Sequence, residues 1–181
     1  INAPRGNRGR FAEQLLSSTH VHYAAQGLAV MTAVPPPVGR LHRRTERARP
    51  GHFEGWYKAR TVADYLGALA SNGRALALEL KSTTENRWYL SQVEEHQADF
   101  LDRWATVGAL AYVLVVFITD SLIPDAAILS WPALQGELRQ QGRNDRGLTW
   151  ESLAREFRSA AAVDTVGVPP LNYLPAIRCI E

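Results

Sequence analysis

The alternation of apolar and polar residues is most regular over residues 75–81, which predicts a β-strand. Three leucines at alternate positions would face one side of this strand, while Glu79 and Lys81 would face the other, about 6–7 Å apart. The Ser-Asn-Gly sequence at residues 71–73 is a strong hairpin signal. It predicts pairing with an earlier strand over residues 61–66.

The remaining pattern predicts helices alternating with strands. Gly27 suits the end of a first helix, a capping box at residues 91–94 suits the start of another, and the near-continuous apolar run at 109–118 is typical of a central strand. The predicted helices span 11–26 (with Phe11, Leu15, Ser18 and His22 on one face), 91–107, 132–140 and 149–161, and the further strands span 28–32, 109–118 and 127–131. The tail from Val168 is expected to end in a short strand or extended arm. This order indicates a mixed α/β domain, a sheet flanked by helices.

Composition narrows the class of protein. The chain has 181 residues, of which 46% are apolar, which suits one folded domain and argues against wholesale disorder. Its longest apolar runs fall short of the ~18 residues that a membrane span requires, so no membrane association is expected. A single cysteine, Cys179, allows no intrachain disulfide and fits a reducing cytoplasm.

Positive charge is concentrated in two segments, although the net charge is only +2. Residues 1–10 carry three arginines and no acid, and residues 40–60 carry seven cations and two acids, a local charge of +5. Such segments favour contact with a polyanion, although a solvated basic loop would have the same composition. The candidate nucleic-acid contacts are Arg8, Arg10, Arg40, Arg43, Arg44 and Arg47.

Asp64, Glu79 and Lys81 form the candidate catalytic group. Two carboxylates on neighbouring hairpin strands could hold Mg²⁺, which prefers hard oxygen ligands, and a lysine beside them could orient a water or stabilise phosphate charge. An Asp followed by Glu-x-Lys is the PD-(D/E)xK pattern of metal-dependent nucleases. The same spacing also arises by chance in strands that carry only a surface salt bridge.

Six short motifs in order resemble the RecU family of Holliday-junction resolvases, and together they extend over nearly the whole chain. The motifs are Asn7-Arg8-Gly9, Val34-Pro35-Pro36-Pro37-Val38, Asp64-Tyr65-Leu66-Gly67, Glu79-Leu80-Lys81, Leu90 with Glu95-His96-Gln97, and Pro170-Leu171-Asn172-Tyr173-Leu174.

The resemblance implies a restriction-endonuclease-like fold in a single nuclease domain, 1–181, with a projecting basic stalk at 34–60. By position, the family's metal ligands fall on Asp64, Glu79 and Gln97, and its transition-state lysine falls on Lys81. The implied activity is symmetric cleavage of four-way junctions in recombination and repair by a cytoplasmic homodimer that uses Mg²⁺ or Mn²⁺. A branch-migration helicase and a recombinase are the protein partners that this activity suggests.

One departure and two alternatives remain open at this point. The family has a threonine ligand where this chain has Val62, and Thr61 would point to the other face of a regular strand. Glu13, on the first helix, could also approach the metal site. The alternatives are another PD-(D/E)xK nuclease, specific for flaps, ends or sequences, and a catalytically weak DNA-binding recombination protein.

Overall fold

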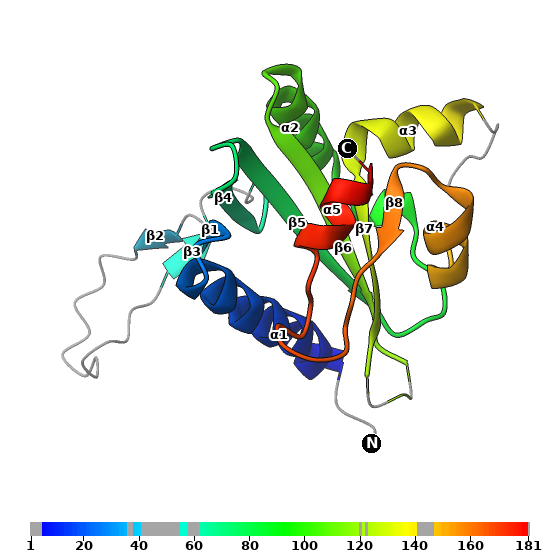
Figure 1. The fold of residues 1–181 in the computed structure, drawn as a ribbon, viewed down its shortest axis with the longest axis horizontal. Helices are drawn as coiled ribbons and strands as arrows, with labels where there is room; N and C mark the ends of the chain where they lie inside the picture. The colour runs from blue at the N-terminus through cyan, green and yellow to red at the C-terminus, as the bar shows by residue number, and fades with distance from the viewer. Residues whose placement is uncertain are drawn as a thin grey trace.

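The computed structural model describes residues 5–35, 38–40, 55–57, 62–119, 121, 123–140 and 147–180. Its elements are α1 (Arg5–Ala25), β1 (Ala29–Ala33), β2 (Val38–Arg40), β3 (Gly55–Tyr57), β4 (Tyr65–Leu69), β5 (Ala75–Thr83), η1 (Leu90–Gln92), α2 (Glu95–Thr106), β6 (Leu110–Phe117), β7 (Asp125–Ser130), α3 (Trp131–Gln140), α4 (Trp150–Glu156), β8 (Ala160–Ala162) and α5 (Leu174–Ile180). One sheet has the strand order β1-β4-β5-β6-β7-β8 (Figure 1). Its strands pair antiparallel except for β5 and β6, which are parallel. This is the predicted mixed sheet flanked by helices.

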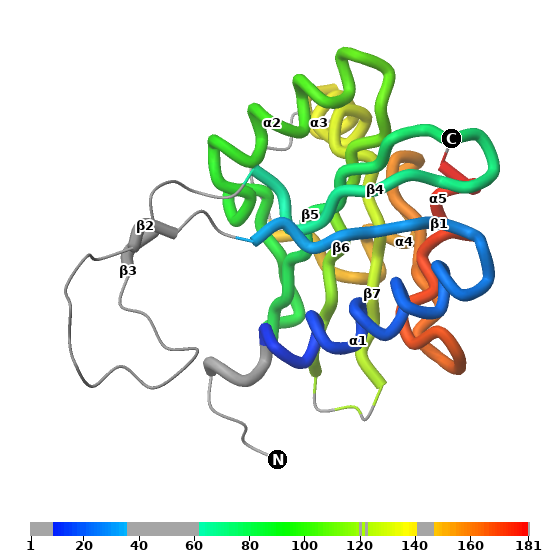
Figure 2. Tube along the Cα trace, turned by 90° about the vertical axis from the view of Figure 1, so that its left-hand side faces the viewer, coloured from blue at the N-terminus to red at the C-terminus, as the bar shows by residue number. Residues whose placement is uncertain are grey.

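Helices cover both faces of the sheet. One core contains side chains of α1, α5 and one face of the strands, and the other contains side chains of α2, α3, α4 and the opposite face. Figure 2 shows α2 and α3 above the strands and α1 below them. All of β6 is buried, as its apolar run predicts. Within the part of the chain that the structure describes, each helix is too short or too polar to cross a membrane.

The predicted stalk, residues 34–60, lies largely outside the described residues. Its two described parts, β2 and β3, form an antiparallel pair in which Val38 is opposite Tyr57. The pairing shows that the chain returns close to its point of departure, and the stalk itself stays a prediction.

The end of α1 confirms the role predicted for Gly27. Gly27 has φ +62°, a left-handed conformation that suits glycine. Its N–H donates to Ala24 O at 3.1 Å, and Leu28 N–H donates to Tyr23 O at 2.9 Å. These two bonds make a Schellman motif, which satisfies carbonyl groups at the helix end and directs the chain into β1.

The face predicted for α1 is wrong. Phe11, the first residue of the predicted stripe, is 38% exposed. Because the sheet and the C-terminal segment pack against the neighbouring stripe, the buried positions are Ala12, Leu16, Thr19, His20 and Tyr23.

The prediction of an extended C-terminal arm is also wrong, because the segment ends in α5. Hydroxyl groups of α1 bind the chain that leads into this helix. Thr19 Oγ1 accepts from Leu171 N at 3.1 Å, and Tyr23 Oη accepts from Leu174 N at 3.2 Å. Tyr23 also donates to Asn172 Oδ1 at 2.9 Å. The motif at residues 170–174 therefore joins the two ends of the described chain.

Two predicted helix boundaries are wrong, because contacts elsewhere in the fold move them. The helix predicted from Ser91 begins after Glu94, which forms a capping box with Gln97, and only a 3₁₀ turn occupies the predicted start. The helix predicted to reach Ala161 ends at Glu156, because the following chain joins the sheet as β8.

Gly67 in β4 is required by a close approach of β1. It lies opposite Met31 in the ladder, and a Cβ at this position would collide with the carbonyl oxygen of Val30. The same Cβ would lie 2.5 Å from Met31 Sδ and 2.9 Å from Met31 Cα. Most of the blocking atoms are backbone, so the strand itself would have to move.

We expect Gly67→Ala to lower the free energy of unfolding by roughly 2–3 kcal/mol, because overpacking displaces β1. Urea denaturation followed by circular dichroism measures this change. The matched control is Gly136→Ala in α3, where a Cβ meets no atom within 4 Å. That substitution should raise stability by up to about 1 kcal/mol through helix propensity. Equal stability of wild type and Gly67→Ala would contradict the close approach.

His20 is a buried, neutral histidine between aromatic side chains. It is 6% exposed, its Nε2 lies 3.1 Å from Tyr173 Oη, and its ring meets the edge of Tyr65 at 4.8 Å. Burial lowers the pKa of His20 to about 4, and burial also raises the pKa values of Tyr65, Tyr173 and nearby Tyr23. The cluster is therefore uncharged at neutral pH.

Acidification should destabilise the fold through His20. The unfolded chain takes up a proton as pH falls below about 6.5, whereas the folded chain does so only near 4, so the loss builds up between these values to about 3 kcal/mol. The measurement is the free energy of unfolding of wild type minus that of His20→Gln across this range. A variant at the partly exposed His22 is the control and keeps the wild-type pH dependence, because it leaves His20 in place. A flat difference curve would refute the prediction.

Candidate active site

Asp64 and Glu79 lie opposite each other across the β4–β5 hairpin. The antiparallel register pairs Tyr65 with Leu78, so one step further along it places Asp64 against Glu79. Asp64 lies one residue before β4, not inside a strand from residue 61 as predicted. Its Oδ2 accepts a hydrogen bond from Leu80 N at 2.8 Å, which fixes the carboxylate against β5.

Glu79 is held by two side chains. It is 1% exposed, and its Oε1 lies 2.8 Å from Lys81 Nζ, two residues further along β5. The same oxygen accepts a short hydrogen bond from Gln97 Nε2 of α2. Lys81 Nζ in turn donates to Gln97 Oε1 at 2.9 Å. The structure thus brings together the three residues of the predicted catalytic group and the glutamine that the resemblance added.

The environment of Glu79 favours its protonated form. Burial, and then the negative charge on Asp64, raise the pKa of Glu79 to about 7, although Lys81 acts in the opposite direction. Asp64 therefore lies close enough to Glu79 to disfavour its ionised form. Two adjacent carboxylates under partial burial repel each other unless a proton or a cation lies between them.

The donor set at this position fits a divalent metal ion. Glu79 Oε2 is buried and has no hydrogen-bond partner, and Asp64 adds a second anionic oxygen donor. Hard cations such as Mg²⁺ and Mn²⁺ bind such oxygens and often take only one or two carboxylates. The described residues include no group of three or more His, Cys, Asp or Glu suited to a metal. Val62, which has no hydroxyl group to offer as a ligand, is 38% exposed.

Glu13 of helix α1 lies within electrostatic range of Tyr65, the residue that follows Asp64. The pKa of Tyr65 is raised by burial and lowered by a hydrogen bond with Ser17, and it is raised again by the charges of Glu13 and Asp64. Glu13 and Asp64 therefore both lie within electrostatic range of the Tyr65 hydroxyl. The sequence could suggest Glu13 only as an open alternative, because its approach depends on how α1 packs on the sheet.

The candidate DNA-binding arginines are only partly described. Arg10 is exposed on α1. Arg8 belongs to α1 and Arg40 to β2, and the structure gives the backbone of each. The other three candidates lie outside the described residues; they are Arg43, Arg44 and Arg47.

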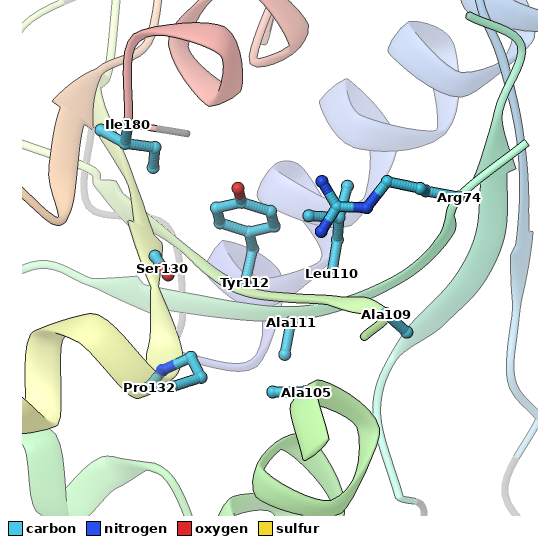
Figure 3. A pocket seen from close by; sticks show the side chains of 9 residues that line it. All are labelled: Arg74, Ala105, Ala109, Leu110, Ala111, Tyr112, Ser130, Pro132 and Ile180. Carbon is cyan, nitrogen blue, oxygen red and sulfur yellow. The ribbon is translucent and has the colours of Figure 1, made fainter. Parts of the chain in front are cut away.

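A separate cavity of about 240 Å³ lies where β6 begins. Figure 3 shows Arg74, Tyr112 and Ser130 among its lining side chains. The parallel register pairs Leu110 in this lining with Leu76, whereas Glu79 lies three residues further along β5. Because none of the candidate catalytic residues lines this cavity, it is distinct from the carboxylate site.

Comparison with known proteins identifies the family. The sequence matches the family described as "Recombination protein U" (RecU) over residues 7–178. The chain therefore belongs to the RecU family, as the six motifs predicted. The observed sheet agrees with the predicted fold class in its architecture, a mixed sheet flanked by helices.

Individual relatives match over part of their length. Two proteins of Streptococcus pneumoniae, from serotype 19F (strain G54) and from strain 70585, are described as Holliday junction resolvase RecU; each is 26% identical over 113 residues, 61% of this chain and 56% of the relative. The chain thus spans about half the length of these curated relatives. A solved structure of Archaeoglobus fulgidus Hjc, described as a Holliday junction resolvase, has a TM-score of 0.33 and 14% identity, and the match covers 63% of this chain and 74% of that one.

Asp64→Asn should raise the stability of the metal-free protein. At pH 8, above the pKa of Glu79, both carboxylates carry charge. Removing one charge should add about 1 kcal/mol to the free energy of unfolding. The asparagine oxygen can still accept from Leu80 N. The gain should shrink as pH falls below about 7, because Glu79 then binds a proton and the repulsion disappears.

Chemical denaturation in EDTA at pH 8 and pH 6 measures this effect. The control is Asp99→Asn, which removes an exposed carboxylate from α2. A variant at Asp64 that is less stable than wild type at pH 8 would show that the two carboxylates do not repel each other.

Proposed function

We propose that this chain is a metal-dependent endodeoxyribonuclease that resolves four-way DNA junctions as a homodimer. The observation that carries the proposal is the carboxylate pair of Asp64 and Glu79, of which one buried oxygen has no partner. Membership of the RecU family supports the choice of substrate. Relatives of this family are described as Holliday junction resolvases.

Each side chain of the site has a role that its contacts support. Asp64 and Glu79 would hold Mg²⁺ or Mn²⁺ through carboxylate oxygens. The ion, when bound, supplies Lewis-acid charge that offsets the negative charge of the phosphodiester. Lys81 has three ammonium protons, two of which are directed to Glu79 and Gln97. The third can reach a phosphate oxygen or the attacking water, where positive charge stabilises the transition state.

The DNA contacts and the dimer follow from charge and symmetry. Arginines of the N-terminal segment and of the stalk would bind phosphates, which gives affinity without sequence preference. Symmetric resolution needs two cuts, one in each of two strands, and a homodimer with two-fold symmetry supplies two equivalent sites. A branch-migration helicase and a recombinase are the partners that act before such a cut.

The proposal predicts cleavage of a mobile four-way junction in Mg²⁺ or Mn²⁺ and none in EDTA. Asp64→Asn and Lys81→Met should each reduce the rate by at least ~10³-fold, because each removes charge that the transition state requires. Junction binding, measured by mobility shift, should survive both substitutions. Asp99→Asn is the control for loss of a carboxylate outside the site. Unchanged cleavage by Asp64→Asn would place the active site elsewhere.

Two other outcomes would replace this proposal. Equal cleavage of junction, flap and linear duplex would favour a PD-(D/E)xK nuclease of another specificity. The second alternative, a DNA-binding recombination protein with little activity, is favoured by Val62, which stands where the family has a threonine. Isothermal titration with Mn²⁺ distinguishes it: junction binding without any metal binding would support this alternative.

A further inference from the structure

The cavity of about 240 Å³ at the start of β6 lies where several elements begin or end. Its lining comes from the β4–β5 turn, the end of α2, the start of β6, the end of β7, the start of α3 and the last turn of α5 (Figure 3). Arg74 and Ile180, which lie far apart in the sequence, thus line one space. Neither Asp64 nor Glu79 belongs to this lining, so the cavity has no part in the proposed metal site.

The hairpin turn between β4 and β5 directs Arg74 to this cavity. Asn72 Oδ1 accepts from Arg74 N at 3.0 Å, and Arg74 O accepts from Leu69 N at 3.0 Å, so the backbone of Arg74 is fixed on both sides. The side chain donates from Nη2 to Gly108 O at 3.4 Å, in the segment that joins α2 to β6. A guanidinium group has five N–H donors in one plane, so Arg74 can bind an anion and keep this contact.

The polar groups of the lining are one cation and two hydroxyl groups. Figure 3 shows Arg74 extending toward Tyr112, and Ser130 contributes the second hydroxyl group. Tyr112 is 3% exposed, so the packing of its ring fixes the position of its hydroxyl group. Among the residues that the structure describes, no acidic side chain lines the cavity. This combination favours an anionic ligand.

The size of the cavity and the rest of its lining restrict the kind of anion. At ~30 Å³ for each water molecule, the cavity has room for roughly eight waters or for a ligand of about eight non-hydrogen atoms. A nucleotide is much larger than that. The rest of the lining is mostly apolar and includes Leu110, Pro132 and Ile180. A single guanidinium group balances one negative charge, which suits a carboxylate better than a doubly charged phosphate monoester.

We propose that this cavity binds a carboxylate carried on a short apolar chain. The carboxylate would accept two parallel N–H bonds from Arg74 and one O–H bond from Tyr112, and the apolar chain would cover Leu110 and Ile180. A small carboxylic acid and the C-terminus of a peptide with an apolar last residue both have this chemistry. The site requires neither metal nor DNA, and it is therefore independent of the proposed nuclease function.

Titration of the full-length chain with hexanoate in EDTA, followed by amide NMR spectra, tests the site. Hexanoate has the size and charge that the cavity admits, and EDTA keeps it from binding through a metal ion. We expect shifts at Leu110, Ala111 and Ile180 with a Kd of roughly 1 mM, and none at Asp64 or Glu79. Hexanamide, which has the same chain without the charge, should bind at least ~10-fold more weakly. Equal affinity for hexanoate and hexanamide would overturn the proposal.

Variants of the lining test the two anchoring groups. Arg74→Met should weaken hexanoate binding at least ~10-fold, and Tyr112→Phe, which keeps the buried ring, should weaken it by roughly 3–10-fold. The matched control is Arg139→Met, which removes an exposed arginine of α3 outside the lining and should leave the Kd unchanged. If the Arg74 and Arg139 variants bind hexanoate equally well, the attraction depends only on general positive charge and the proposal is wrong.

Two tripeptides distinguish the sources of the carboxylate. One ends in leucine with a free carboxylate, and the other is its C-terminal amide. Tighter binding of the free-ended peptide than of hexanoate would assign the cavity to the end of a peptide chain, and the reverse would assign it to a small acid. Both results support the shared chemistry. Equal binding of the peptide and its amide, or preferential binding of inorganic phosphate, would overturn it.

Discussion

The burial of one carboxylate, that of Glu79, constrains the architecture around it. A buried ionised carboxylate is unfavourable unless charges and hydrogen bonds compensate it. Lys81 supplies the charge from the same strand, and Gln97 supplies a donor from α2. Asp64 works against both, since it adds a second negative charge at close range. Gln97 of α2 and Lys81 therefore stabilise the ionised form of Glu79, and Asp64, one residue before β4, opposes it; two carboxylates so close together favour the binding of a cation.

The topology of the sheet brings Gln97 of α2 to the face of β5 that carries Glu79. Strand β5 is antiparallel to β4 and parallel to β6. A parallel pair needs a long crossover, and here η1 and α2 form it. The crossover covers the face of β5 that carries Glu79, so the element that permits the parallel pairing also carries Gln97. The same packing that forms the core on this face thus completes the site.

Local patterns predicted the elements whose causes are local. The alternation over residues 75–81, the Asn-Gly turn and Gly27 each act within a few residues, and the structure confirms β5, the hairpin and the end of α1. The start of α2 was missed because residues 91–94 match a capping box in the sequence, whereas in the structure Glu94 and Gln97 form it. Contacts of Gln97 with Lys81 and Glu79, 16 and 18 residues away, favour this later start. Similarly, α5 depends on Thr19 and Tyr23, more than 150 residues earlier.

The residues of the candidate site also differ in how far local sequence predicts them. Asp64, Glu79 and Lys81 lie on one hairpin, so their spacing alone predicted that they would meet. Gln97 came from a family resemblance, since a glutamine near a helix start has no pattern that distinguishes a buried bridge from an exposed cap. In the structure Gln97 has both roles, because the same side-chain oxygen accepts from the backbone N–H of Glu94 and from Lys81 Nζ. Gln97 therefore takes part both in the capping box of α2 and in the hydrogen bonds of the candidate site.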